Sequence, residues 1–456
     1  MLPTHRTLLK VISFIILSIN CHIYALDLHD AKHLWSRTGF SSTNLLISKH
    51  KQLSRDEAIK IIIDAPLYYP PEKSLPKFNK ELYAALRSNK TSKKEKQQIK
   101  KKILNKDRKN LQIWWYQQIL DTKNPLQEKM TVFWHNHFTS DLQKVFPPYM
   151  LKQNQIFRIH GLGNFKKLLN EFMHDPAIHI YLDNIKNKKQ NPNENLAREL
   201  LELFTLGEGS HYSEQDIKNI AKALTGYRVD FNKQKLVFKK RQHDSSFVKI
   251  FNSSGSYSID GVLKLILSHP MTAKFITEKF WREFISDKPD EKEIERISII
   301  FRNSGYEIKE LISEILHSES FWDKKNYNTL IKSPFDLLTS TLHLTQLNDS
   351  EVNKIPLLIS KSGQKLFYPP DVRGWRGGIY WLSTELIIAR KKMLRKYIKK
   401  VINNNKKTDP RYLSKVVNTI TKKHQFFAIG DTIPKKITKP MSKLIYLLSH
   451  DKYNFK

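Results

Sequence analysis

The chain is poor in cysteine, glycine and proline, and these shortages argue against particular classes of protein. Its 456 residues include one cysteine, Cys21, with 14 glycines and 19 prolines. So few glycines and prolines argue against a β-rich or a disordered protein. The sequence also lacks a Walker loop, a GxSxG elbow, an HExxH helix and a dinucleotide fingerprint. It therefore offers none of the common catalytic signatures.

Long apolar runs are missing too. The N-terminal run VISFIILSI, at 11–19, follows basic residues and is far shorter than the roughly 20 residues that span a bilayer. With its basic start and a cleavage site at its end, 1–25 is typical of a signal peptide. We expect an exported, periplasmic or secreted protein whose mature chain, 26–456, has neither cysteine nor a transmembrane helix. An uncleaved anchor and a lipid anchor on Cys21 are the alternatives.

Acidic residues are scarce relative to basic ones. There are 44 Asp and Glu against 78 Lys and Arg, which gives a formal net charge of +34. Basic chains bind nucleic acids or anionic envelope polymers. The lysines are scattered, however, and no nucleic-acid-binding signature accompanies them. With the secretion signal, this pattern predicts no nucleic-acid partner.

Lysine itself is absent between Lys189 and Lys218, and acids fill the gap. At about 100° per residue, a helix here places its polar residues on one side and its leucines on the other. The polar face consists of Glu194, Asn195, Arg198, Glu199 and Glu202. Gly207 is expected to end the helix. This segment, 191–216, is called the acidic island below.

The acidic island has two interpretations. Charged helix faces are usually solvated salt-bridge ladders, here with Arg198 between two glutamates. Alternatively, Glu199 and Glu202 are catalytic acid/base groups, because carboxylates at i,i+3 couple their titrations and can raise one pKa. In that hypothesis Asn195 and Arg198 bind substrate.

Two further lysine gaps carry candidate residues. In 130–143, His135, His137 and Asp141 are candidate ligands of a divalent metal, provided that the histidines share a face as on a strand. On a helix they would diverge by about 200° and one could be a core histidine.

The other gap, 366–390, reads as a loop shaped by glycine and proline. We call 366–382 the aromatic loop. It carries side chains suited to stacking on sugar rings or to binding an anionic group: Asp371, Arg373, Trp375, Tyr380 and Trp381. The alternative is an ordered loop that its aromatic residues hold over the core.

A weaker acid/base candidate is the pair His243 and Asp244, which could equally lie in a turn. The pair falls in 227–251, the one segment with a β-hairpin pattern. Elsewhere the periodicity predicts helices, for example from Pro125, in 212–225 with Ser213 as N-cap, and over 384–403. The sequence predicts a mainly α, multi-helical single large domain with a small β-hairpin-like insertion.

Several segments, in this order, resemble the successive blocks of one bacterial family, catalogued as domain of unknown function 1800. They are RTGFSSTNLLI, PLQEKMTVFWHNHF, DPAIHIYLDN, NENLARELLELFTLG, YSEQDIKNIAKALTGY, HPMTAKFITEKFWREFI, KSPFDLL, LFYPPDVRGWRGGIYW and LIYLLSHDKYNFK. The resemblance implies a secreted, mainly helical protein. It also implies a secreted partner encoded nearby that is similar to sulfatases and phosphatases. It supplies no reaction. Lysine-rich inserts at 88–108, which could be flexible, and at 399–423 depart from the family pattern.

Two functional hypotheses remain. The first is an envelope hydrolase or lyase acting on a polysaccharide or other anionic polymer. The second is a non-catalytic binding or assembly protein that serves the secreted partner. If the acidic island, the histidine segment (130–143) and the aromatic loop converge in one cleft, the enzyme hypothesis gains. If they lie on separate faces, the assembly hypothesis gains.

Overall fold

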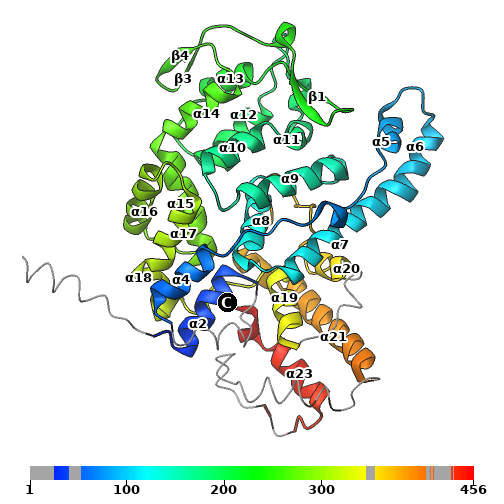
Figure 1. Ribbon diagram of the computed structural model, residues 1–456, viewed down its shortest axis with the longest axis vertical. Coiled ribbons are helices and arrows are strands. Elements are labelled where there is room, and N and C mark those ends of the chain that lie inside the picture. The colour runs from blue at the N-terminus through cyan, green and yellow to red at the C-terminus, as the bar shows by residue number, and fades with distance from the viewer. Residues whose placement is uncertain are drawn as a thin grey trace, which may run out of the picture.

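The computed structural model describes residues 25–40, 53–345, 355–406, 411, 414, 433–434 and 436–456. The expected signal peptide and Cys21 therefore lie outside the described residues, as does most of 399–423. The described chain is mainly helical, as the sequence predicts (Figure 1). Within it, no helix combines the length and the apolar character that crossing a bilayer requires.

The elements run along the chain in a first stretch up to residue 223 and a second from residue 227. Two of them, η2 and η4, are π-helical turns. The first stretch contains α2 (Leu28–Thr38), α4 (Arg55–Ile63), η1 (Glu72–Ser74), α5 (Lys80–Arg87), α6 (Lys93–Ile99), η2 (Lys100–Leu104), α7 (Asn105–Asp121), α8 (Pro125–His137), α9 (Pro147–His160), α10 (Phe165–Met173), α11 (Pro176–Tyr181), η3 (Asn184–Lys186), α12 (Asn195–Glu199), η4 (Leu200–Thr205) and α13 (Glu214–Ala223). The second contains β1 (Tyr227–Asp230), β2 (Lys235–Phe238), η5 (Lys240–Gln242), β3 (Val248–Ile250), β4 (Ser253–Gly255), α14 (Ile259–Ser268), α15 (Pro270–Phe284), α16 (Glu291–Asn303), α17 (Ile308–His317), α18 (Glu319–Trp322), η6 (Lys324–Asn326), α19 (Pro334–Thr345), α20 (Ile355–Ser360), η8 (Gly378–Leu382), α21 (Thr384–Lys406), α23 (Pro440–Ser449) and η10 (Asp451–Asn454).

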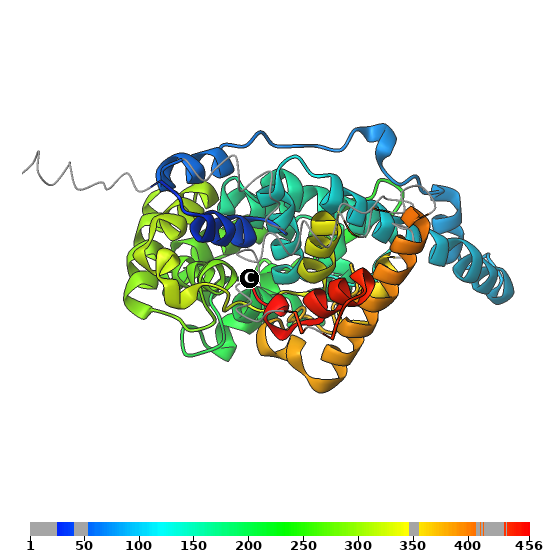
Figure 2. The same cartoon turned by 90° about the horizontal axis from the view of Figure 1, so that it is seen from below.

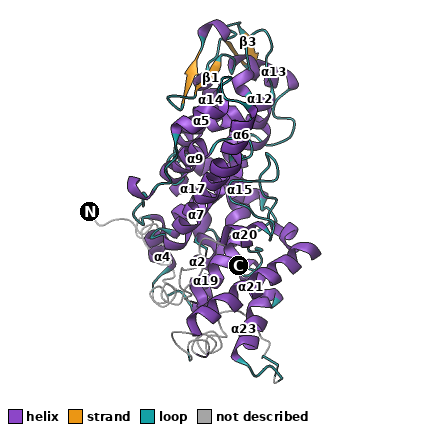
Figure 3. Ribbon diagram, turned by 90° about the vertical axis from the view of Figure 1, so that its right-hand side faces the viewer, coloured by secondary structure: helices purple, strands orange, loops and turns teal. Residues whose placement is uncertain are grey.

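Local signals set many of these boundaries. The side chain of Asn124 caps α8, and Pro125 occupies its first turn, where no amide hydrogen is needed. Ser213 caps α13 in a capping box with Asp216, as its sequence predicts. The expected β segment is confirmed as two antiparallel hairpins, β1–β2 and β3–β4, at one end of the molecule (Figure 3).

The lysine-rich insert forms a projecting arm. Helices α5 and α6 stand away from the body, and α7 leads back into it, as the view from below shows (Figure 2). Most lysines of α6 and η2 are exposed. The arm therefore presents a strongly basic surface to the solvent.

The buried apolar side chains form two large clusters that meet at α8. One includes α2, α4 and most of the helices from α8 to α18. The other joins α7 to α19, α20, α21 and α23. Met130 and Trp134 of α8 belong to the first cluster, whereas Val132 packs against the second. Helix α8 thus holds the histidine segment between the two halves of the core.

Candidate functional site

The acidic island forms the expected ladder, with one irregularity. Helix α12 passes directly into the π-helical turn η4, where the amide of Leu206 donates to the carbonyl of Leu201. Such single π turns occur often at functional sites. The sequence predicts one regular helix here, because helical periodicity does not distinguish a π turn within it. Gly207 follows with φ of +84° and ends the helix, as expected.

Arg198 is the centre of the polar face. It pairs with Glu194 at 3.3 Å and with Glu202 at 3.2 Å, the i,i+4 contacts that the sequence predicts. It also forms two hydrogen bonds of 2.8 Å with Glu214 of α13, a bidentate contact. Three carboxylates therefore fix the guanidinium. None of these hydrogen bonds involves Glu199.

The histidine segment touches the acidic island. His137 Nε2 lies 3.0 Å from the carbonyl oxygen of Phe204 in η4. Because a carbonyl can only accept, Nε2 carries the hydrogen. The contact satisfies one of the carbonyls that a helix end leaves unpaired.

The same segment holds the aromatic loop. The amide of Trp375 donates to Asn136 Oδ1 at 2.7 Å, and Asn136 Nδ2 donates to the carbonyl of Trp375 at 3.4 Å. Gly374 lies so close that a Cβ atom there would be 2.3 Å from Asn136 Oδ1, and its φ is +80°. Only glycine fits that position.

The aromatic loop also reaches the acidic island directly. Arg373 Nη2 lies 2.7 Å from Glu208 Oε1, between two exposed side chains. Half-burial raises the pKa of Glu199, and the charge of Glu202 adds to that effect, against the opposing charge of Arg373. The acidic island, the histidine segment and the aromatic loop thus meet in one place.

The Asn136 contact gives a first prediction. Asn136→Ala leaves the amide of Trp375 without its partner, which is expected to lower the free energy of unfolding by about 1–3 kcal/mol. The loss should appear in the denaturation midpoint. Arg373→Gln, which breaks only an exposed pair, is the matched control and should change stability by about 0–1 kcal/mol. Equal effects would contradict a specific role for Asn136.

The candidate metal ligands do not come together. His135 packs among the rings of Trp115, Phe157 and Phe367, on a different side of α8 from His137. Asp141 Oδ1 accepts a hydrogen bond from the amide of Gln143. In the part of the chain that the structure describes, no group of three or more His, Cys, Asp or Glu side chains could hold a metal ion. The histidines are divergent because they stand on a helix, which was the alternative interpretation.

Burial of the histidines predicts acid sensitivity. It lowers the pKa of His135 from 6.5 to about 3. At a pH between these two values, this side chain binds a proton in the unfolded chain but not in the folded one. Stability should therefore fall as the pH drops below about 6.5, by up to about 1.4 kcal/mol per pH unit for this side chain. His135→Phe should remove about 2 kcal/mol of the difference in stability between about pH 7 and about pH 5, measured by urea denaturation. The exposed His211, changed to Gln, is the control, and a dependence unaltered by His135→Phe would refute the assignment.

His243 and Asp244 make hydrogen bonds to Thr225 and Ser246. His243 Nδ1 is 3.0 Å from the carbonyl oxygen of Thr225. The amide of Asp244 donates to Thr225 Oγ1, and its carboxylate accepts from the amide of Ser246. Both residues therefore serve the turn beside β2, which was the alternative interpretation of this pair.

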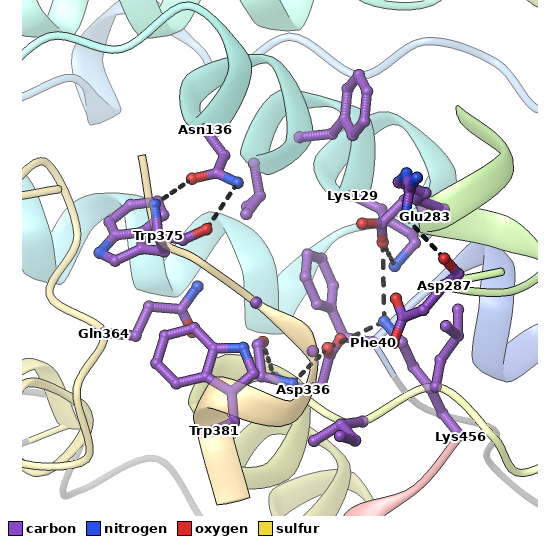
Figure 4. Close-up of a pocket in the computed structure, with 18 residues that line it drawn as sticks. Phe40, Lys129, Asn136, Glu283, Asp287, Asp336, Gln364, Trp375, Trp381 and Lys456 are labelled. Atoms are coloured by element: carbon purple, nitrogen blue, oxygen red, sulfur yellow. Dashed lines mark hydrogen bonds and ion pairs between the residues drawn. The ribbon is translucent and has the colours of Figure 1, made fainter. Parts of the chain in front are cut away.

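The opposite side of the aromatic loop closes a pocket with about 140 Å³ of free space (Figure 4). Trp375, Trp381, Phe40 and Phe133 supply its rings, and Figure 4 shows charged side chains gathered across from the two tryptophans. The charged lining residues are Lys129, Arg282, Glu283, Asp287, Asp336 and Lys456. Sequence reasoning placed Trp375 and Trp381 in a binding role but missed every one of these charges.

Four of these charged residues form one chain of ion pairs. Lys129 Nζ lies 2.6 Å from Glu283, and Lys456 Nζ lies 3.0 Å from Asp336 and 3.7 Å from Glu283. Burial alone would raise the pKa of Asp336, but Lys456 and Lys129 outweigh it and hold the value at about 2. Burial likewise opposes the charge of Lys129, yet Glu283 and Asp336 raise its pKa. Asp336 and Lys129 are therefore charged at neutral pH, whereas burial lowers the pKa of Lys456.

A signal for the pocket was present in the sequence. Lys129, Glu283 and Asp336 are charged residues inside largely apolar stretches, EKMTVFW, FWREFI and SPFDLL. The blocks that carry the family resemblance supply most of the lining, from Phe40 in the first to Lys456 in the last. Two others, DPAIHIYLDN and NENLARELLELFTLG, contribute to the opposite side of the aromatic loop. The resemblance blocks therefore surround this loop.

Comparison with known proteins gives one result. A family model described as "Protein of unknown function (DUF1800)" matches residues 33–451. Neither a curated protein nor a solved structure matches the chain.

Proposed function

The chain belongs to the DUF1800 family, whose description assigns no reaction, and from its geometry we propose an exported cell-envelope enzyme. It would be a hydrolase or lyase that acts on a polysaccharide or other anionic envelope polymer. The observation that carries the proposal is the meeting of the acidic island, the histidine segment and the aromatic loop. Segments far apart in the sequence are joined there by polar contacts of 2.7–3.0 Å.

Glu199 is the proposed acid/base group. Its raised pKa brings proton exchange closer to the working pH, which general acid–base catalysis requires. Glu202 lies one turn away and accepts a hydrogen bond from Arg198 at 3.2 Å. The pair therefore combines one carboxyl that is half-buried with one that is hydrogen-bonded to an arginine.

Polar side chains around Glu199 form the proposed substrate surface. Asn195 is exposed beside it on the acidic island, and Asp371 and Arg373 are exposed on the aromatic loop. Tyr181, whose hydroxyl interacts with the charges of Glu199 and Asp371, lies between the two segments. The hydroxyls and carboxylates of a polysaccharide can bond to such a mixture of donors and acceptors.

The basic arm supports an anionic substrate. The net charge of +34 and the exposed lysines of α6 and η2 attract a polyanion before any specific contact forms. Electrostatic capture of this kind weakens as salt increases. Binding of the polymer should therefore be salt-dependent, whereas the chemistry at Glu199 should not.

The test is a product assay on envelope polysaccharide fractions. A hydrolase releases reducing ends without unsaturation, and a lyase releases reducing ends together with unsaturated, ultraviolet-absorbing sugar ends. The same assay with Glu199→Gln, detailed in the Discussion, tells this activity from a contaminant. If neither product forms with any anionic fraction, the enzyme proposal fails.

A second candidate function rests on the tip of the aromatic loop. Ile379 and Tyr380 are 76% and 46% exposed there, an apolar pair that suits a protein partner. In this hypothesis the chain is a binding or assembly protein for a secreted sulfatase- or phosphatase-like protein encoded nearby. Ile379→Asp should then abolish its co-purification with that partner and leave any polymer cleavage unchanged.

A further inference from the structure

We propose that the pocket behind the aromatic loop binds one uncharged six-membered sugar ring, a single unit of the polysaccharide substrate. The inference rests on the proposed function, because the pocket shares the aromatic loop with Glu199. In this arrangement the pocket would select which sugar unit the enzyme accepts. Its residues are outside the acid/base surface and have no role in the proposed chemistry.

The size of the pocket limits the ligand. Its free space of about 140 Å³ is close to the roughly 150 Å³ of an engineered protein cavity that holds one six-membered aromatic ring. A single sugar ring is comparable in bulk. An oligosaccharide could enter with one unit only, with the rest of the chain outside.

The lining combines flat rings with groups that bond to hydroxyls. Trp375, Trp381, Phe40 and Phe133 offer apolar faces to the C–H groups of a sugar ring. Carboxylates accept from hydroxyls and ammonium groups donate to them, so each hydroxyl of a sugar can find a partner. A purely apolar ligand would leave these charged groups dry, at a high cost.

The balance of charge favours a neutral ligand. The lining has equal numbers of acids and bases, which are Glu283, Asp287 and Asp336 against Lys129, Arg282 and Lys456. Neighbours in this set already pair at 2.6 and 3.0 Å, and Arg282 donates to the carbonyl of Asp287 at 2.7 Å. A charged ligand would add an uncompensated charge to this low-dielectric space. Hydroxyls can instead use the lone pairs and hydrogens that the ion pairs leave free.

The loop backbone leaves room for the ligand. Gly377 and Gly378 line the pocket with φ of +66° and +53°, a region that side chains rarely adopt. No heavy atom lies within 4 Å of a Cβ atom placed on Gly377. The backbone here borders open space, through which a sugar unit can approach.

The test is a titration of the mature protein with free sugars, followed by calorimetry and by the rise in Tm that a ligand of the folded state produces. Glucose, galactose, mannose and N-acetylglucosamine are the neutral probes, and glucuronate is the charged one. We expect at least one neutral sugar to bind and glucuronate to bind more weakly.

Two variants locate the binding. Val132→Phe extends a ring from α8 into the pocket. Glu283→Gln keeps the shape of the side chain but replaces one acceptor oxygen with an amide group. Each should weaken the sugar by roughly tenfold or more. The exposed Glu310→Gln on α17 is the charge-matched control and should bind normally. Tm without ligand is measured for each variant, and if Val132→Phe fails to fold, Glu283→Gln decides.

Three results would overturn the inference: stronger binding of glucuronate, no binding by any neutral sugar, or sugar binding that survives in both variants. Its failure is distinct from failure of the proposed function. Loss of cleavage in Glu199→Gln with no sugar binding would retain the enzyme and reject the pocket assignment. Sugar binding with cleavage unaltered in Glu199→Gln would retain the pocket assignment and reject the proposed function.

Discussion

Replacing Glu199 by Gln is expected to lower kcat on the envelope polymer by roughly 10²- to 10⁴-fold, the usual contribution of one acid/base group. The carboxyl is half-buried, and burial together with Glu202 raises its pKa. An amide of the same shape cannot exchange the proton. Circular dichroism should show an unchanged helical fold, because the side chain makes none of the ladder's ion pairs.

The pH profile separates a chemical role from a structural one. If Glu199 donates a proton, activity falls as the pH rises through its raised pKa, because the carboxylate form cannot donate. Glu199→Gln should lose that limb of the profile along with the rate. Glu310→Gln, an exposed change on α17, should keep full activity. Equal losses in both variants, or a profile unaltered in Glu199→Gln, would show that Glu199 has no special part.

Removing Glu128 is expected to destabilise the fold by about 3–5 kcal/mol, because it leaves a buried arginine unpaired. Arg158 of α9 contacts the two carboxylate oxygens of Glu128 on α8 at 2.7 and 3.0 Å. Their side chains are only 1% and 3% exposed. The pair ties α8, which carries the histidine segment, to α9. Glu128→Ala should therefore lower the denaturant midpoint strongly at an unchanged m-value.

A second ion pair of equal length provides the control. Arg282 and Glu278 of α15 also meet at 2.7 Å, but their side chains are 44% and 34% exposed. Because water and salt screen this pair, Glu278→Ala should cost only about 0–1 kcal/mol. Because the N···O distance is the same in both pairs, the comparison isolates the effect of burial on stability. Similar losses in the two variants would disprove the view that burial makes the Glu128 pair critical.

Most of the helices could be predicted, because their signals are local. The cap at Ser213, the proline that opens α8 and the spacing of the acids around Arg198 each act within a few residues. The ladder Glu194–Arg198–Glu202 follows from i,i+4 geometry alone. The hairpin β1–β2 after Gly226 follows from strand patterning and turn residues, whereas the second hairpin, β3–β4, was not predicted. The π turn η4 was missed, since helical periodicity does not distinguish one π turn within a helix.

The candidate site was only partly predictable. The sequence identified the acidic island and the aromatic loop as unusual, but it could not show that Arg373 meets Glu208 or that Asn136 holds Trp375. Those contacts join residues far apart in the chain. It also placed His243 and Asp244 in the site, whereas their hydrogen bonds belong to a neighbouring turn.

The sequence by itself determined the helical class, the main helix boundaries and the family, because these depend on periodicity, capping and the order of motifs. Only the tertiary structure decided that Lys129, Glu283 and Asp336 share a pocket and that the two histidines diverge into opposite parts of the core. A charge within an apolar helix has no visible partner in the sequence. Its partner is set by how helices pack, and packing depends on contacts between segments that the local sequence does not encode.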